Sequence, residues 1–213
     1  LQADAAVSQA AEDGARPLLV ACQMGHLECV RLLLEASAAV NQAKKSGATP
    51  LYIACQKGHV DIVRLLLEAS AAVGQASTRG VAPLYIACQM GHLEIARLLL
   101  EAGAAVGQAM NNGATPLIIA CQKGHLDVAR LLRDAGASLN PAGEHRTTPL
   151  CLACQQGHLG RGRLPLEAGA PVDQAKQNGA TPLLIASQKG HVEIARLLLE
   201  ANAAVDQAAE SGA

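Results

Sequence analysis

The segment that begins with Gly47-Ala-Thr-Pro-Leu51 and continues to Gly58-His59 indicates the fold most directly. Thr49 followed by Pro50 predicts the start of a helix, because a Thr hydroxyl accepts a hydrogen bond from a first-turn amide and Pro has no amide hydrogen there to lose. Gly58 can end this helix by taking the left-handed backbone conformation. The residues in between therefore predict a short helix.

A second helix is predicted after His59, because apolar residues recur at spacings of three and four and so share one face. Charged residues at the same spacings line the opposite face. The apolar face consists of Ile62, Leu65, Leu66 and Ala69, and the charged face of Asp61, Arg64 and Glu68. Ser, Thr and Gly in the remaining segment, residues 72–80, predict an extended turn that leads to the next copy.

The whole pattern recurs with a constant period of 33 residues, marked by a Pro in each first helix and a Gly-His pair between the helices. The prolines are Pro17, Pro50, Pro83, Pro116, Pro149 and Pro182. Six repeats are thus predicted at about 14–46, 47–79, 80–112, 113–145, 146–178 and 179–211, with a partial repeat at 1–13. Because neither helix exceeds about ten residues, each repeat must bury its apolar face against its neighbours. We expect a single stacked array over residues 1–213.

The composition suits a thin core between closely packed helices, since half of the 213 residues are hydrophobic but Trp and Phe are absent and Tyr occurs twice. The formal charge is -1 and aromatic residues for base stacking are scarce, so we expect no nucleic-acid partner. No uninterrupted apolar run approaches the roughly 18 residues of a membrane helix, so no membrane association is expected. The expected location is cytoplasmic.

Three segments give the repeat a specific resemblance to the ankyrin repeat: Gly47-Ala-Thr-Pro-Leu51, Gly58-His59 and Leu65-Leu66-Leu67-Glu68-Ala69. The resemblance covers essentially the whole chain. It implies an all-α fold, an ankyrin-repeat solenoid of stacked antiparallel helix pairs with projecting β-hairpin-like fingers. It also implies that the chain binds other proteins through the fingers and the first, inner helices.

The fifth repeat departs most from the other copies. Arg146 replaces the Gly that most repeats carry at this turn, so the turn is strained or rebuilt if it needs a positive backbone angle. Gly160, Gly162 and Pro165 fall in the second helix and cost on the order of 5 kcal/mol of helix propensity. We therefore predict a kinked, shortened or partly disordered helix near Pro165.

The repeated cysteines and histidines invite a metal or thiol site, but their spacing argues against one. Five repeats carry a Cys four residues before the His, at Cys22, Cys55, Cys88, Cys121 and Cys154. A zinc ion needs about four ligands within ~2.3 Å, whereas equivalent positions in packed repeats lie roughly 8 to 10 Å apart. Cys151-Leu-Ala-Cys154 spells the redox motif CxxC but follows no strand, so coincidence explains it better. We expect buried thiols, structural histidines, and no catalytic residue, cofactor or metal.

Candidate partner-binding residues lie at the finger tips, where the six copies differ, and on the inner helices, where a Gln is followed by Met, Lys or Gln. Exposed turns also vary by drift, and duplication of a two-repeat block also explains the alternation of Met and Lys; both alternatives stay open. The finger candidates are Lys44, Lys45, Thr78, Arg79, Asn111, Asn112, Glu144 and His145. The inner-helix candidates are Gln56, Lys57, Gln89, Met90, Gln122 and Lys123.

These residues predict a non-enzymatic scaffold or adaptor that binds a protein or peptide. Gln amides can bond a peptide backbone while Met packs against apolar side chains. The alternative is a structural spacer, or a segment of a longer array that associates end to end through its terminal repeats.

Overall fold

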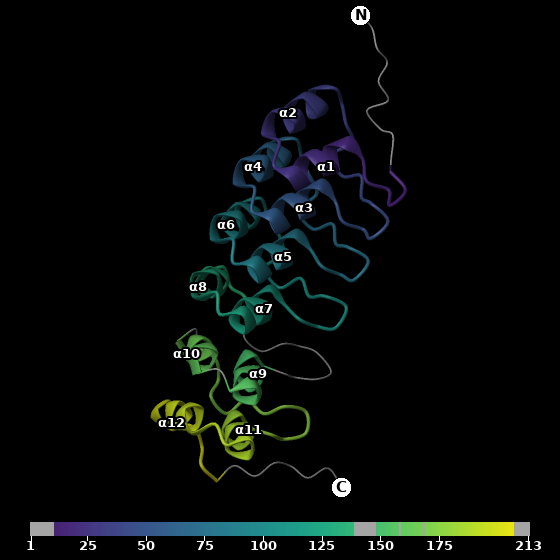
Figure 1. Ribbon diagram of the computed structural model, residues 1–213. Coiled ribbons are helices and arrows are strands. Elements are labelled where there is room, and N and C mark those ends of the chain that lie inside the picture. The colour runs from purple at the N-terminus through teal and green to yellow at the C-terminus, as the bar shows by residue number, and fades with distance from the viewer. Residues whose placement is uncertain (1–10, 139–147, 158, 168, 207–213) are drawn as a thin grey trace, which may run out of the picture. The chain divides into compact units, whose positions relative to one another are not determined.

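A computed structural model describes residues 11–138, 148–157, 159–167 and 169–206, apart from the side chains of residues 159, 160, 161 and 164. These residues form helices and turns, with no strand among them, and each repeat contributes a first and a second helix (Figure 1). The first helices are α1 (Pro17–Met24), α3 (Pro50–Lys57), α5 (Pro83–Met90), α7 (Pro116–Lys123), α9 (Pro149–Gln156) and α11 (Pro182–Lys189). The second helices are α2 (Leu27–Glu35), α4 (Val60–Glu68), α6 (Leu93–Glu101), α8 (Leu126–Asp134), α10 (Leu159–Glu167) and α12 (Val192–Glu200).

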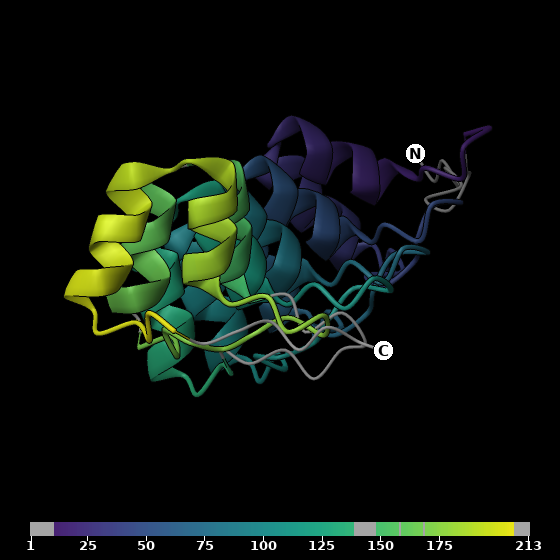
Figure 2. The same cartoon turned by 90° about the horizontal axis from the view of Figure 1, so that it is seen from below.

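The chain divides into two compact halves, Leu1–Asn111 and Asn112–Ala213. In the N-terminal half, α3 packs between α1 and α5, and α4 packs between α2 and α6. In the C-terminal half, α9 packs between α7 and α11, and α10 packs against α12. Within each half the fingers, which link one repeat's second helix to the next repeat's first helix, project on the side of the first helices (Figures 1 and 2). The predicted all-α stack of helix pairs is confirmed.

The predicted helix boundaries are confirmed by the caps. The Thr49 hydroxyl oxygen accepts a hydrogen bond from the Tyr52 amide at 3.1 Å, and Thr115, Thr148 and Thr181 cap α7, α9 and α11 in the same way. Gly58 ends α3 with φ 80°, in the left-handed region that glycine adopts without strain. These local signals set the length of each first helix at eight residues.

The core is a thin layer between the two rows of helices. Leu51, Ile62 and Leu66 are at most 2% exposed, and the repeated cysteines lie in the same layer. Asp61, Arg64 and Glu68 are exposed, as their spacing predicts. Each repeat therefore stabilises its neighbour by burying small and aliphatic side chains, with the two tyrosines as the bulkiest additions.

Neighbouring finger tips in the N-terminal half are joined by main-chain hydrogen bonds. The amide of Lys45 donates to the Asp13 carbonyl at 2.9 Å, that of Thr78 to Ser46 at 3.0 Å and that of Asn111 to Arg79 at 3.3 Å. Within one finger, Lys44 donates to Ala48 at 3.0 Å and Gly47 donates to Lys44 at 2.8 Å, which closes a tight hairpin-like turn.

Gly47 shows why this turn needs glycine. Its φ is 79°, and a Cβ added there would lie 2.7 Å from the main-chain nitrogen of Thr78. The positive angle that we considered for this turn is therefore present at Gly47, and also at Gly80 and Gly179. Arg146, which replaces this glycine in the fifth repeat, lies outside the described residues.

The second helix of the fifth repeat is not shortened, so that part of our prediction is wrong. Helix α10 has nine residues, the same number as α4. Pro165 is its seventh residue and removes one amide donor near the end of the helix. The helix then ends as the others do, since the Ala170 amide donates to the Pro165 carbonyl at 2.9 Å. A kink at Pro165 stays a prediction.

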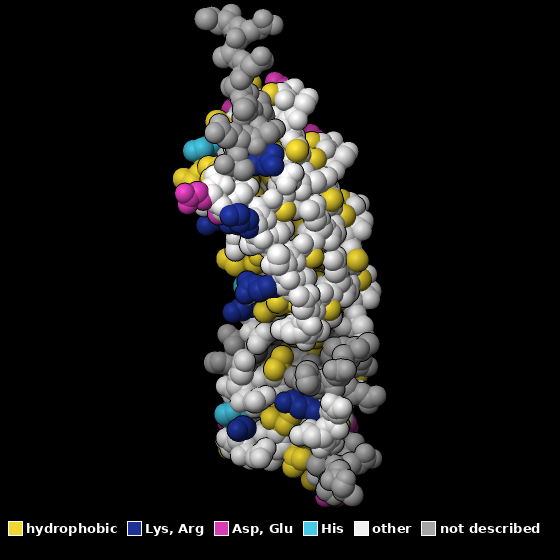
Figure 3. Space-filling model, turned by 90° about the vertical axis from the view of Figure 1, so that its right-hand side faces the viewer, with side chains coloured by type: hydrophobic (Ala, Val, Ile, Leu, Met, Phe, Trp, Pro, Cys, Tyr) yellow, Lys and Arg dark blue, Asp and Glu magenta, His cyan; other side chains and the backbone are white. Residues whose placement is uncertain are grey.

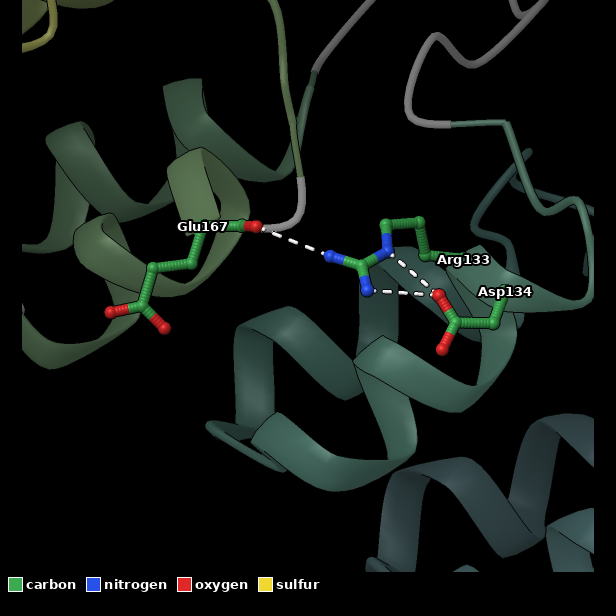
Figure 4. Close-up of polar contacts among 3 residues, drawn as sticks. All are labelled: Arg133, Asp134 and Glu167. Carbon is green, nitrogen blue, oxygen red and sulfur yellow. Dashed lines mark hydrogen bonds and ion pairs between the residues drawn. The ribbon is translucent and has the colours of Figure 1, made fainter.

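Arg133 supports the end of this irregular helix from the preceding repeat. Its Nη1 donates to the main-chain carbonyl of Glu167, the last residue of α10, at 3.2 Å (Figure 4). Asp134 Oδ1 accepts hydrogen bonds from Arg133 Nη2 at 2.8 Å and Nε at 3.0 Å, which orients the guanidinium. The other repeats carry Leu at the position of Arg133, so the arginine precedes the one repeat whose second helix contains a proline.

Candidate partner-binding surface

The finger-tip candidates in the N-terminal half are exposed to different degrees. Lys45 and Arg79 are exposed, whereas Lys44 is half-buried and its ammonium lies 3.8 Å from the Asp13 carboxylate. Asn112, which begins the C-terminal half, is exposed, and its Oδ1 accepts a hydrogen bond from the Ala114 amide at 3.1 Å. Glu144 and His145 lie outside the described residues. Lys45 and Arg79 are thus the finger cations best placed to meet a partner.

Two further finger candidates hold the fingers together. The Thr78 hydroxyl donates to the Ser46 carbonyl at 3.0 Å, and Asn111 Nδ2 donates to the Thr78 carbonyl at 3.3 Å. Both side chains are exposed, yet each already uses a polar group to bond the preceding finger. Their role in the structure is to support the register of the fingers, a role that their variable sequence does not reveal.

The inner-helix candidates lie at the ends of the first helices. Gln56, Gln89 and Gln122 are half-buried, whereas Lys57 and Lys123 are exposed as the last residues of α3 and α7. The side chain of Met90, the last residue of α5, is 48% exposed. The first helices therefore present long, flexible side chains at the surface beside half-buried amides.

Two apolar residues belong with this group although our candidate set omits them. Met24, the last residue of α1, is 60% exposed, and Val20 on the same helix is 46% exposed. Met24 occupies the same repeat position as Met90, so the period alone could have identified it. Val20 could not be found in this way, because its counterparts Ile53 and Ile86 are buried.

Within each half, the fingers approach the first helices. In the N-terminal half, burial raises the pKa of Tyr52 on α3, and the Arg79 guanidinium in the finger partly offsets the rise, which places this cation beside the helix. In the C-terminal half, the finger residue Lys176 donates from Nζ to Gln155 Oε1 on α9 at 3.2 Å. In each half, one finger cation thus lies beside a first helix, at Tyr52 for Arg79 and at Gln155 for Lys176.

Charge is divided between the two sides of the helix layers. The first helices contain no Asp or Glu, whereas the second helices carry acidic residues together with arginines. On the side that carries the fingers, the visible charged side chains are mainly Lys and Arg (Figure 3). Although the net charge of the chain is close to zero, the only charged residues on the first helices are therefore basic, one Lys each on α3, α7 and α11.

The acidic residues of the second helices form exposed ion pairs. Arg31 Nε lies 3.6 Å from Glu28 Oε2, and Glu94 pairs with both Arg64 and Arg97. All of these side chains are about half exposed or more, so each pair contributes at most about 1 kcal/mol. This side of the molecule is a solvated charged face.

The repeated cysteines are buried free thiols, as predicted. Burial raises the pKa of four of these five to about 12 and also raises the pKa of the fifth, Cys55, and that of Cys151, which lies outside the repeated position. The four are Cys22, Cys88, Cys121 and Cys154. A redox CxxC motif needs a thiolate with a lowered pKa, and Cys151 and Cys154 show the opposite shift. Among the described residues, no group of three or more potential ligands could hold a metal ion.

Three of the repeated histidines, His59, His92 and His191, pack against the preceding repeat. A Cβ added to Gly25 would lie 2.8 Å from Cε1 of His59, and one added to Gly157 would lie 2.5 Å from Cε1 of His191. Nε2 of His92 is buried and has no hydrogen-bond partner within the described part of the chain. The imidazole rings thus act as spacers between repeats, which agrees with the structural role that we expected.

Comparisons with known proteins agree with this architecture. The family model for ankyrin repeats matches the chain in three copies, at residues 1–77, 70–143 and 139–209. A search of curated protein sequences finds no match. In the described ranges, no helix is both long and apolar enough to span a bilayer. The matched segments cover nearly all of the 213 residues, and the chain therefore belongs to the ankyrin repeat family.

Proposed function

We propose that this chain is a non-enzymatic scaffold or adaptor, one array that binds a protein or peptide partner through its finger tips and first helices. Ankyrin repeats are generally protein–protein interaction modules. The observation that carries the proposal is the exposure of Met24, Lys57 and Met90 at equivalent positions of three packed helices. Most framework positions on these helices are buried, so exposed Met and Lys at one repeated position make a surface available for contact.

The proposed contact residues follow from exposure and bonding. Lys45, Arg79 and Lys57 are proposed as electrostatic contacts, Met24 and Met90 as apolar contacts, and Gln56 and Gln122 as hydrogen-bonding groups. Thr78 and Asn111 are expected to contribute less, because their polar groups are engaged between fingers. Nucleic acid and membranes are not proposed as partners, since the net charge is -1 and aromatic residues are scarce. We propose a cytoplasmic location.

Charge reversal on one helix row tests this proposal. The variant K57E/K123E/K189E changes the first helices, and the control R31E/R97E/R196E makes the same change in net charge on the second helices. Proteins captured from a lysate of the source cells would be compared by quantitative mass spectrometry. We expect the first variant, and not the control, to lose captured proteins. Equal capture by wild type and both variants would exclude the first helices as the binding surface.

Self-association is a second candidate function, favoured by apolar side chains on the first and last helix pairs. Val20 and Leu32 are 46% and 63% exposed, and Leu184 and Leu199 are 40% and 48% exposed. The counterparts of Leu184 in other repeats, Tyr52 and Ile118, are buried, so a second copy could bury Leu184 in a similar way. Light scattering should then show a mass that rises with concentration and falls in L184E/L199E. A constant monomer mass would contradict this candidate.

A further inference from the structure

We propose that the N-terminal half binds an acidic peptide segment in which Asp or Glu is flanked on both sides by apolar residues. The acidic residues lie at Lys57, and the apolar residues pack against Met24 on one side and Met90 on the other. This inference rests on the proposed function, because it names the chemistry of the partner for the same surface.

The exposed apolar groups of the N-terminal half lie mainly on its first helices. Within residues 11–111 the large hydrophobic side chains with high exposure are Val20, Met24, Leu32 and Met90. Three of these four lie on the first helices, α1 and α5, and α3 packs between those helices. Met is unbranched and polarizable, so it adapts to apolar side chains of different shapes. Two apolar contact points therefore lie on either side of α3.

The first helices of this half carry one charge, and it is positive. Helices α1, α3 and α5 contain no acidic residue, and Lys57 is their one charged side chain. In the fingers of this half the basic residues Lys44, Lys45 and Arg79 outnumber the acidic residues Glu12 and Asp13, and Lys44 lies 3.8 Å from Asp13. A partner that places carboxylates here is attracted electrostatically and associates faster. A basic partner is repelled by the like charges. Charge complementarity therefore selects an acidic segment.

The spacing of Met24 and Met90 sets the spacing of the apolar residues in the peptide. Packed helices lie roughly 8–10 Å apart, so Met24 and Met90, two helices apart, are separated by roughly 16–20 Å. An extended chain rises about 3.3 Å per residue, so its apolar residues would be about five or six positions apart. The side-chain amide of Gln56, next to Lys57, can bond the main chain of such a segment. The preferred peptide has an apolar residue, an acidic centre, and a second apolar residue.

Peptide selection on the full chain tests the inference without knowledge of the natural partner. A phage library of random 12-residue peptides would be selected on wild type, on K57E and on the control R97E, which changes the net charge equally on a second helix. We expect wild type and R97E to enrich acidic peptides with apolar residues about five or six positions apart. We expect K57E to lose this enrichment.

Affinity measurements on the best acidic peptide complete the test. Fluorescence anisotropy should show binding about tenfold weaker to K57E than to wild type, and weaker to M24A/M90A, with R97E unchanged. A random single-stranded DNA oligonucleotide should not displace the peptide. Displacement by the oligonucleotide, or unchanged binding to K57E, would overturn the inference.

The two proposals fail in different ways. If uncharged or basic peptides are enriched and depend on Met24 and Met90, the acidic partner is wrong but the binding surface stands. If no peptide is enriched, the inference of a linear peptide partner is wrong, and the capture experiment with the lysine variants still decides the proposed function.

Discussion

A Cβ built on Gly58 would lie 2.8 Å from Cε1 of His92, so the imidazole of one repeat fills the space beside the helix cap of the preceding repeat. Gly58 also has φ 80°, which side chains other than glycine rarely adopt. The same packing joins Gly25 to His59. Glycine is thus required at this cap for two independent reasons, its own backbone angle and the neighbouring ring.

We expect Gly58→Ala to lower the free energy of unfolding by about 2–3 kcal/mol, because the backbone is strained and the His92 ring must move. Gly103→Ala is the control, since Gly103 has φ 84° but no neighbour within 4 Å, and it should cost about 1 kcal/mol. Urea denaturation measures both. In the double mutant with His92→Ala, the excess cost of the Gly58 change should shrink. Equal costs for the two glycine variants would contradict the role of the histidine.

Helix capping gives a matched pair of predictions. Thr49→Ala removes the hydrogen bond to the Tyr52 amide and should destabilise the N-terminal half by about 1 kcal/mol. Ala82→Thr should add the equivalent cap to α5. Ala82 directly precedes this helix, and its φ of -80° and ψ of 161° are close to the angles of Thr49. We expect a gain of about 1 kcal/mol in urea denaturation. A loss of stability in A82T would show that the buried site has no room for the Thr side chain.

An added methyl group should stabilise the irregular helix α10. A Cβ on Gly162 would meet Leu197 Cδ2 at 3.7 Å and Ile194 Cγ2 at 3.9 Å, which are ordinary contact distances. Gly162→Ala should therefore stabilise the C-terminal half by about 1 kcal/mol through helix propensity, with further contacts added. Gly169 has φ 84°, so Gly169→Ala should destabilise the C-terminal half instead. Amide hydrogen exchange of α10 in the G162A variant should slow, and unchanged exchange would contradict the prediction.

Arg133 should stabilise α10 through the Glu167 carbonyl. Arg133→Leu restores the residue of the other repeats but removes the hydrogen bond at the helix end, so we expect a loss of about 1 kcal/mol. Arg130→Leu is the control, because its 3.4 Å pair with the Glu167 carboxylate is exposed and should contribute less than about 0.5 kcal/mol. Thermal denaturation would compare the two. If R133L is as stable as wild type, the arginine does not support the helix end.

The buried thiols should make the fold sensitive to alkali. Burial raises the pKa of Cys88 from 9.0 to about 12, so the unfolded chain releases this proton at a lower pH than the folded chain does. The stabilisation is fully present below about pH 9 and is lost as the pH rises from 9 towards 12. At about pH 10 the contribution of this thiol should have fallen by roughly 1 kcal/mol. The difference in unfolding free energy between wild type and C88A should shrink by that amount between about pH 7.5 and pH 10, and a constant difference would contradict the assignment.

The helices could be predicted because their signals are local. Thr49, Pro50 and Gly58 act within one or two helical turns, and the period of 33 residues repeats them without an insertion. The length of α10 was predicted wrongly, because propensity ignores the packing of neighbouring repeats and the hydrogen bond from Arg133. That bond joins residues 34 positions apart, and such a contact has no signature in one repeat.

The candidate surface was less predictable than the fold. Thr78 and Asn111 vary between repeats as contact residues do, yet they bond the preceding finger, which only the register of adjacent fingers reveals. Exposure at Val20 depends on whether another helix covers α1, and residue type does not encode this. Lys57 and Met90 could be recognised, because their position at the end of a helix followed by glycine recurs in every copy.

The hydrogen bonds between adjacent finger tips determine which substitutions the array tolerates. Main-chain groups of Lys45 and Thr78 make those bonds, while Gly47 and Gly80 supply the required backbone angles. Exchanging the side chain of Lys45 or Arg79 leaves the spacing of the tips intact. New recognition properties can therefore arise, by evolution or by library design, through tip substitutions that leave the folding of the repeats untouched.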